Sequence, residues 1–164
     1  KNLETLIKEI EDVVKNSFKE AYDEIDKNFN YMCKEILNNS IGNLSLLDET
    51  DLLESGVELM VKFKNKKYQS LSLLSGGEKS MVAVALIMAI FMYKPSPFTF
   101  FDEIEAALDE SNTKRLLRKL KEFTDRSQFI LITHNKHTMK ESDQLYGVTM
   151  NKEIGESRIV SVDI

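Results

Sequence analysis

The sequence has 164 residues, of which 42% are hydrophobic, and a formal net charge of −5 at pH 7. This length and composition predict one globular domain, and the acidic balance argues against a protein whose whole surface binds nucleic acid. Because the single cysteine, Cys33, has no internal disulfide partner and no signal peptide is visible, we expect a reduced, cytosolic protein that extends upstream of Lys1.

The first predicted element is one long amphipathic helix, because apolar residues recur at helical spacing from Leu3 to Leu37. Between Phe18 and Ile36 they alternate in steps of four and three, a coiled-coil rhythm that is too short to establish a coiled coil. A helix laid on a core fits the same pattern, with Cys33 as a small core residue. Residues 38–40 and Gly42 predict the end of this helix.

Residues 57–63 alternate between apolar and polar side chains, which predicts a half-buried strand in a small sheet region. Four lysines lie at its end and just after it, at Lys62, Lys64, Lys66 and Lys67. They leave a local nucleic-acid-binding patch open, although a solvated strand edge is the simpler interpretation.

A capping box defines the start of the next helix. Ser75 and Glu78 form the S-x-x-E pattern ahead of an apolar run, so the helix begins at Gly76. From Met81 to Tyr93 nearly every residue is apolar, but this run is shorter than the ~20 residues that a bilayer requires. We therefore expect a buried core helix, which the following Pro-Ser-Pro segment ends.

Two apolar strands and a hairpin are predicted in the remainder of the chain. Residues 98–101 are too apolar for an exposed edge, so we expect a central strand there. A charged helix over residues 110–123 leads to a neighbouring buried strand at residues 128–133, and this order predicts a parallel crossover. The tail from Gln144 to Ile164 has two β-like runs around residues 153–157, which predicts a terminal hairpin.

Two glycines after the capping serine can let a ligand approach the backbone closely. Gly76 and Gly77 leave free amides at the positive end of the helix, which attracts an anion such as a γ-phosphate. Many capped helices begin with Ser-Gly and bind nothing, so this pattern alone is weak. No G-x-x-x-x-G-K-[ST] phosphate loop occurs in the sequence, and the element that cradles the phosphates must lie on another chain or a missing segment.

Two carboxylates follow the first apolar strand, at the strand end where ligands bind in open α/β sheets. Asp102 can hold magnesium there, and Glu103 can orient and deprotonate a water. His134 follows the adjacent strand and can reach the same edge as Glu103. Acidic pairs are also common helix caps, as Asp109 is expected to be, and lone histidines are common on surfaces. The order of the motifs, rather than any one of them, indicates a nucleotide site.

At these residues the sequence resembles a known family. Residues 74–80 resemble the signature motif of ABC-type ATPases, and residues 98–103 resemble their Walker B strand. Residues 107–109 resemble the D-loop, and residues 132–136 resemble the switch-histidine segment. The segments that resemble the carboxy-terminal half of the head domain of SMC (structural maintenance of chromosomes) proteins are residues 95–98, 104–109, 138–139 and 145–150.

The resemblance covers essentially the whole chain and implies an α/β fold. It implies the carboxy-terminal lobe of an ABC-type ATPase head, with a parallel-sheet core, a long coiled-coil-proximal helix and a terminal β-hairpin. Residues 1–40 would form that helix, and residues 41–164 would form the lobe. Phe101 stands where leucine is usual, Thr99 interrupts the apolar strand and Glu105 replaces a common aspartate. None of these departures removes a catalytic carboxylate.

In that family two heads sandwich ATP between the phosphate loop of one head and the signature motif of the other. The resemblance implies that Asp102 supports Mg²⁺, that Glu103 is the general base and that His134 contacts the γ-phosphate. Asp109 would cross the dimer interface. The nucleotide-binding residues of the signature segment would be Leu74, Ser75, Gly76, Gly77, Glu78 and Lys79.

The implied function is ATP hydrolysis at a head–head interface that drives chromosome cohesion, condensation or organisation. The implied partners are the amino-terminal lobe of the same head, a second SMC head, a kleisin subunit and DNA through the complete complex, with no membrane. The location would be the cytoplasm and nucleoid of a prokaryote, or the nucleus and chromosomes of a eukaryote.

Three alternatives stay open. Two of them share the same chemistry: the head of a coiled-coil DNA-repair ATPase and a transporter nucleotide-binding domain. Transporter signatures usually continue Ser-Gly-Gly-Gln, whereas Glu78-Lys79-Ser80 and the segment 147–150 favour SMC. A non-catalytic interaction module would keep the fold and only bind partners, but Asp102 and Glu103 speak against it.

Overall fold

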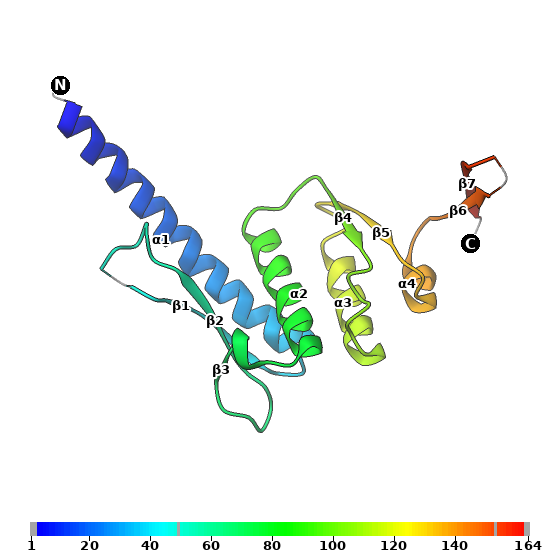
Figure 1. Ribbon diagram of the computed structural model, residues 1–164, viewed down its shortest axis with the longest axis horizontal. Helices are drawn as coiled ribbons and strands as arrows, with labels where there is room; N and C mark the ends of the chain where they lie inside the picture. The colour runs from blue at the N-terminus through cyan, green and yellow to red at the C-terminus, as the bar shows by residue number, and fades with distance from the viewer. Residues whose placement is uncertain (1–2, 49, 153, 163–164) are drawn as a thin grey trace.

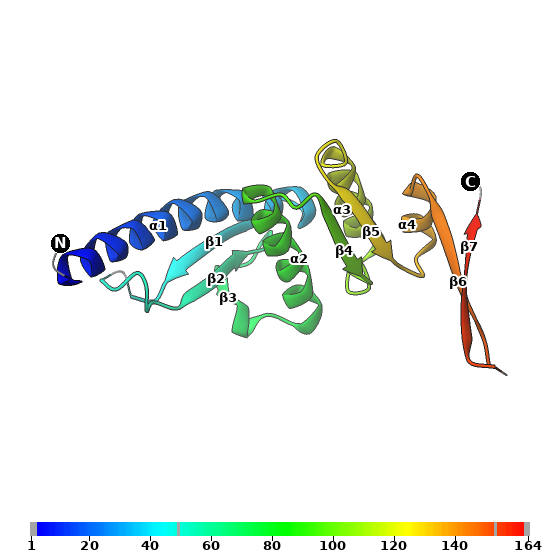
Figure 2. The same cartoon turned by 90° about the horizontal axis from the view of Figure 1, so that it is seen from above.

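The structure is a computed structural model that describes residues 3–48, 50–152 and 154–162. The helices and strands lie in a row from the amino-terminal helix to a carboxy-terminal hairpin (Figure 1). Seen from above, the hairpin stands apart at one end of this row (Figure 2). The fold is α/β, as the sequence predicts.

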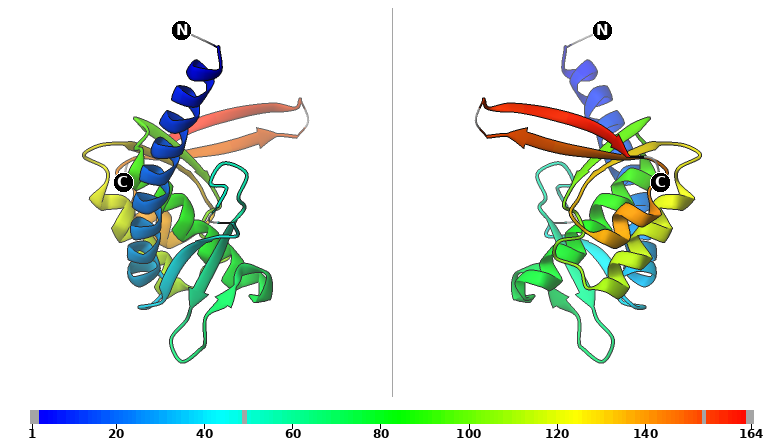
Figure 3. Two further views of the ribbon diagram at one scale, coloured as in Figure 1. Left: turned by 90° about the vertical axis from the view of Figure 1, so that its left-hand side faces the viewer. Right: turned by 90° about the vertical axis from the view of Figure 1, so that its right-hand side faces the viewer.

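Helix α1, Leu3–Ile36, confirms the predicted long amphipathic helix. Its carboxy-terminal part enters the core through Phe29, Met32, Cys33 and Ile36, all fully buried. The apolar side chains of its first half are exposed instead, at Leu3, Leu6, Ile7, Ile10, Val13 and Val14. This half projects beyond the other elements (Figure 3). The helix is therefore laid on a core at one end and carries an uncovered apolar stripe at the other.

Three strands pack beside α1 as an antiparallel sheet. They are β1 (Ile41–Leu46), β2 (Val57–Lys62) and β3 (Gln69–Ser70), in the order β1-β2-β3. Strand β2 is the predicted half-buried strand. The β1 segment, Ile-Gly-Asn-Leu-Ser-Leu, contains a glycine and an asparagine, which are depleted in strands, and no separate strand was predicted there.

The end of α1 differs from the prediction at one residue. Asn38 and Asn39 adopt positive φ angles of 54° and 59°, a conformation that asparagine tolerates and that breaks the helix. The prediction that Gly42 helps to end the helix is wrong, because this residue lies inside β1. A Cβ at Gly42 would lie 2.5 Å from Cys33 Sγ and 2.8 Å from Phe29 Cε1, so glycine permits the strand to approach the helix closely.

A short 3₁₀ turn, Leu71–Leu73, leads into α2, Gly76–Tyr93, which begins where the capping box predicts. By length and composition alone this helix could cross a membrane. In the structure one face packs against α1, and its buried residues are Val82, Val84, Ala85, Met88, Ala89 and Phe91. Ile87, Ile90 and Tyr93 stay exposed on the helix. The prediction of a core helix is therefore correct for one face only.

Strands β4 (Phe98–Asp102) and β5 (Gln128–Ile132) are parallel and are joined through α3 (Glu110–Glu122). This confirms the predicted crossover, but the prediction that the second strand is buried is wrong for the described residues, because Ile130 and Ile132 are exposed. One face of the pair packs through an aromatic cluster, in which the Phe91 ring lies 5.3 Å from Phe129, and Phe129 lies 6.0 Å from Phe101.

The other face of this two-stranded sheet is uncovered. Its exposed apolar side chains are Phe98, Phe100, Ile130 and Ile132. The prediction that residues 98–101 form a central strand is wrong for the part of the chain that the structure describes, because β4 pairs with β5 alone. A strand that is apolar on both faces requires cover that these residues do not supply.

The chain ends in a short helix and a hairpin. Helix α4, Lys136–Glu141, was not predicted, since six residues are too few to show a periodicity. Strands β6 (Leu145–Asn151) and β7 (Glu156–Val162) are antiparallel, which confirms the predicted hairpin with a shorter connection than expected. Glu153, within the predicted connection, lies outside the described residues.

Candidate functional site

The amino end of α2 carries a complete capping box. Ser75 Oγ accepts a hydrogen bond from the Glu78 amide at 3.4 Å, and Glu78 Oε2 accepts from the Ser75 amide at 3.0 Å and hydroxyl at 2.8 Å. A Cβ added at Gly76 or Gly77 would meet nothing within 4 Å. Packing inside the chain therefore does not require these glycines. Because the first amides of a helix have no partner within it, this exposed end is open to an anion.

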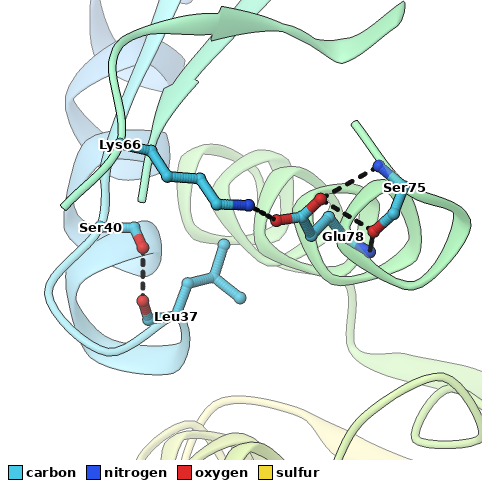
Figure 4. A network of polar contacts seen from close by, with 5 residues as sticks. All are labelled: Leu37, Ser40, Lys66, Ser75 and Glu78. Carbon is cyan, nitrogen blue, oxygen red and sulfur yellow. Dashed lines mark hydrogen bonds and ion pairs between the residues drawn. The ribbon is translucent and has the colours of Figure 1, made fainter. Parts of the chain in front are cut away.

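A lysine from another part of the chain supports the capping box (Figure 4). Lys66 lies in the turn between β2 and β3, and its Nζ is 2.7 Å from Glu78 Oε1. This hydrogen bond, followed by those from Ser75, lowers the pKa of Glu78 from 4.5 to about 2. Glu78 therefore stays ionised and keeps accepting from Ser75. Among the four lysines between residues 62 and 67, Lys66 therefore forms an ion pair within the chain.

The Lys66 contact predicts a pH effect. Since the pKa of Glu78 is lower in the folded state, its contribution to stability is fully present above pH 4.5 and is lost as the pH falls through about 2. Lys66→Met should raise the pKa of Glu78 toward 4.5 and start this loss at a higher pH. Carboxyl-carbon NMR titration measures the pKa directly, with the exposed Lys64→Met as the matched control. An unchanged pKa of Glu78 in Lys66→Met would show that the lysine is not its main determinant.

A second cluster lies where β4 and β5 end side by side. Asp102 is opposite Ile132 in the parallel register, and the amide of Glu103 donates to the Ile132 carbonyl at 2.9 Å. This brings the Glu103 side chain beside the loop that follows β5, where its Oε1 lies 3.1 Å from His134 Nδ1. The structure thus places Glu103 and His134 at one edge, as the sequence predicts. Both side chains are exposed, at 54% and 80%.

The backbone of Glu103 is unusual. Its φ is +46°, in the left-handed region, which residues other than glycine, asparagine and aspartate rarely adopt. The loop after it is a tight turn, with the Ala106 amide donating to the Glu103 carbonyl at 2.9 Å and the Leu108 amide to the Glu105 carbonyl at 2.9 Å. Such strained residues concentrate at functional sites. This strain points to Glu103 independently of its chemistry.

Asp102 fits a magnesium ion as a single ligand. Its carboxylate is exposed at the end of β4, and carboxylate oxygen is the donor that Mg²⁺ prefers. No group of three or more His, Cys, Asp or Glu residues gathers into a metal cage among the described residues. Magnesium commonly takes one or two carboxylates and completes its shell with waters and substrate phosphates, so one aspartate is compatible with such a site.

The remaining predicted residues occupy separate places. Asp109 caps α3, with its Oδ1 accepting from the Asn112 amide at 2.7 Å. Leu74 is buried and anchors the start of α2 in the core, whereas Lys79 is exposed. In the described ranges, no hydrogen bond or ion pair joins the Ser75 end of α2 to the Glu103–His134 cluster. The chain therefore presents two open half-sites.

Neither half-site is an enclosed cavity. Two cavities, of about 240 and 430 Å³, lie elsewhere on the described chain. Asp109 and Arg115 line the first of them, and residues of α1 and β1 line the second. The exposed side chains of Glu103 and His134 suit a site that another surface completes.

Two contacts of these half-sites have no local signal in the sequence. Lys66 reaches Glu78 across 12 positions, and the buried carboxylate of Glu105 is paired with Thr133 across 28 positions. The sequence marks Lys66 only as one of four clustered lysines, and Glu105 only as a departure from a family pattern. Folding, rather than spacing along the chain, brings these partners together.

Comparison with known proteins identifies a family. A profile described as the RecF/RecN/SMC N terminal domain matches residues 5–156. The chromosome partition protein Smc of Fusobacterium nucleatum is 64% identical over 163 residues, which cover 99% of this chain and 14% of that protein. The protein of the same name from Bacillus subtilis is 42% identical over 159 residues, covering 97% and 13%. The chain thus spans about 14% of the length of these curated relatives.

Solved structures agree with the sequence comparison. The Smc head domain of Pyrococcus furiosus, with an extended coiled coil and bound to the C-terminal domain of ScpA, has a TM-score of 0.86 and 36% identity. The match covers 96% of this chain and 39% of that one. The Smc head domain of Pyrococcus yayanosii, with a coiled coil and joint, has a TM-score of 0.87 and 38% identity over 97% of this chain and 30% of that one.

Proposed function

The chain belongs to the RecF/RecN/SMC N-terminal domain family, and we propose that it forms the carboxy-terminal half of an SMC-type ATPase head. Its fold is that of an ABC-type ATPase head, as in the Smc head structures. The family is named for an N-terminal domain, so the assignment to the carboxy-terminal half rests on the motifs. The sequence contains a signature-like segment and the strand that ends in Asp102 and Glu103, but no phosphate loop.

The uncovered apolar faces support an amino-terminal lobe as the missing partner. The outer face of β4 and β5 exposes four large apolar side chains, and parallel sheets are normally covered on both faces. A lobe that adds strands and helices there would also bring the phosphate loop. In the same way, the apolar stripe on the first half of α1 supports residues 1–40 as the coiled-coil-proximal helix, with residues 41–164 as the lobe.

The reaction that fits these half-sites is ATP hydrolysis between two heads. Asp102 would bind Mg²⁺, which supplies charge stabilisation when bound, and Glu103 would take the proton of the attacking water. His134, 3.1 Å from Glu103, would contact the γ-phosphate. The open end of α2, with Leu74, Ser75, Gly76, Gly77, Glu78 and Lys79, would meet the nucleotide of the opposite head, and Asp109 would lie at the interface.

The observation that carries this proposal is the pairing of Glu103 with His134 at adjacent strand ends. It places a candidate base and a candidate phosphate contact together, next to a carboxylate for the metal. The separation of this cluster from the exposed signature end is explained if the two half-sites face different partners. Each nucleotide would then use one half-site from each head.

The wider role that we propose is chromosome organisation. The relatives are chromosome partition proteins, and one similar head is bound to ScpA. A second head, a kleisin subunit and DNA held by the complete complex are the corresponding partners, and the chromosome is the expected location. Similarity to Smc over nearly the whole chain favours this function over a transporter or a DNA-repair ATPase.

A reconstitution experiment tests the proposal. The purified chain alone should not hydrolyse ATP above background, because it lacks the loop that makes most phosphate contacts. With the amino-terminal lobe supplied, Mg²⁺-dependent turnover should appear. Colorimetric phosphate release measures both, with Glu103→Gln heads as the background control. Turnover by the chain alone, or a complex that binds ATP and dimerises without turnover, would contradict the assignment.

A further inference from the structure

The structure contains a buried carboxylate outside the predicted catalytic set. Glu105 is 5% exposed, and its Oε1 accepts hydrogen bonds from the hydroxyls of both Thr133 and Thr138, the latter at 2.9 Å. Within the residues that the structure describes, no lysine, arginine or histidine forms an ion pair with it. A buried carboxylate is expensive unless it is well hydrogen-bonded, so its two threonine partners are important for this region.

These hydrogen bonds join the two loops that carry the half-site. Thr133 directly precedes His134, and its hydroxyl also accepts from the Asn135 amide at 2.9 Å. Thr138 lies in α4, the helix that follows His134, and is 1% exposed. Glu105 lies two residues after Glu103 on the other loop. The carboxylate therefore clamps the loop after β4 to the loop after β5.

The clamp lies beside the strained residue. The backbone of Glu103, with its φ of +46°, is held on both sides. Its own amide donates to the Ile132 carbonyl, and the side chain of Glu105, two positions later, is buried. A strained backbone persists only where the surrounding structure over-determines it. Releasing the Glu105 anchor would let the turn relax and would move the Glu103 carboxylate relative to His134.

We propose that Glu105 is a positioning residue for ATP hydrolysis, which acts by fixing Glu103 and His134 against each other. It touches neither nucleotide nor metal, and it works through Thr133 and Thr138. This inference rests on the proposed function, since it presumes that Glu103 and His134 act on ATP. Its consequence is that the chemical step depends on Glu105, whereas nucleotide binding does not.

The test uses complete heads, with the amino-terminal lobe present. Glu105→Leu removes the acceptor but keeps similar bulk, and should lower kcat about tenfold or more, because small displacements of catalytic groups have effects of this size. The KM for ATP and ATP-dependent dimerisation should change less than about twofold. Glu105→Gln keeps one oxygen for the threonines and should restore most of the turnover. A residue that only supported folding would instead change activity in proportion to the folded fraction.

A matched pair of threonine variants provides the control. Thr138→Val removes one donor to Glu105 and should lower kcat about threefold. Thr113→Val changes an equally buried threonine of α3, whose hydroxyl has no hydrogen-bond partner among the described residues, and should leave kcat unchanged. Melting temperatures of both variants separate folding from catalysis.

The possible outcomes distinguish the two proposals. If Glu103→Gln abolishes turnover but Glu105→Leu heads, measured below their melting temperature, turn over like the parent, the positioning role is wrong and the proposed function stands. Equal kcat values for Thr138→Val and Thr113→Val would also overturn the positioning role. If Glu103→Gln itself has parental turnover, the assignment of Glu103 as the base fails, and the positioning role fails with it.

Discussion

Replacing Glu103 with glutamine is expected to stop most ATP hydrolysis by the complete head while leaving ATP binding intact. The amide preserves the size of the side chain and a contact to His134, which lies 3.1 Å from the carboxylate. It cannot accept a proton from water, and loss of a general base lowers turnover by about 10²- to 10⁴-fold. Because the nucleotide is bound but not consumed, ATP-engaged head dimers should accumulate.

Steady-state turnover and equilibrium ATP binding separate the two effects. Glu20→Gln is a suitable control, because it makes the same change at an exposed residue of α1. Asp102→Asn provides a contrast, since loss of a Mg²⁺ ligand should weaken the whole transition state rather than proton transfer alone. A Glu103→Gln head that turns over ATP like the parent would exclude Glu103 as the base.

Replacing Ser75 with arginine is expected to block ATP-dependent dimerisation while each head still binds ATP through its own phosphate loop. The Ser75 hydroxyl lies at the exposed end of α2, beside Gly76 and Gly77, where an added Cβ would meet no atom of another part of the chain within 4 Å. If a γ-phosphate of the opposite head occupies that space, a bulky side chain excludes it. Binding and dimerisation would then be separated by one substitution.

Loss of the capping box alone predicts a different result. Removing a serine N-cap lowers stability by about 1 kcal/mol, and this would lower the melting temperature without a selective effect on dimerisation. Ser75→Ala shares the lost cap but not the bulk, so it is the matched control. Sedimentation of heads with ATP in a Glu103→Gln background measures dimerisation. A Ser75→Arg head that dimerises normally would contradict a contact between Ser75 and the opposite nucleotide.

Local patterns predict much of this fold because they depend on residues close in sequence. The start of α2 is set by a serine and a glutamate three positions apart, and the structure confirms their reciprocal hydrogen bonds. The parallel pairing of β4 and β5 follows from the order strand, helix, strand. The proximity of Glu103 and His134 follows in turn, since parallel strands bring their carboxyl ends to one edge.

Predictions of which apolar faces are buried were less successful, because burial of a face depends on whether another element packs against it. The apolar pattern of α1, α2 and β4 in the sequence is the same whether or not another element packs against them. The structure shows that α1 is buried only toward its end, that α2 is buried on one face and that β4 is an edge strand. The sequence predicts that Gly42 helps to end the helix, whereas in the structure it lets β1 approach α1 closely.

The sequence alone predicted the residues of the candidate site, the start of α2 and the parallel pairing of β4 with β5, because capping depends on neighbouring residues and the pairing on the local order strand, helix, strand. The tertiary structure alone showed how the site is supported. Two of the supporting contacts join segments that are distant in sequence: the hydrogen bonds of Glu105 with Thr133 and Thr138, and the ion pair of Lys66 with Glu78. The positive φ of Glu103 is held in place by contacts of the same kind. Their energies arise from burial and contact, which exist only once the chain has folded.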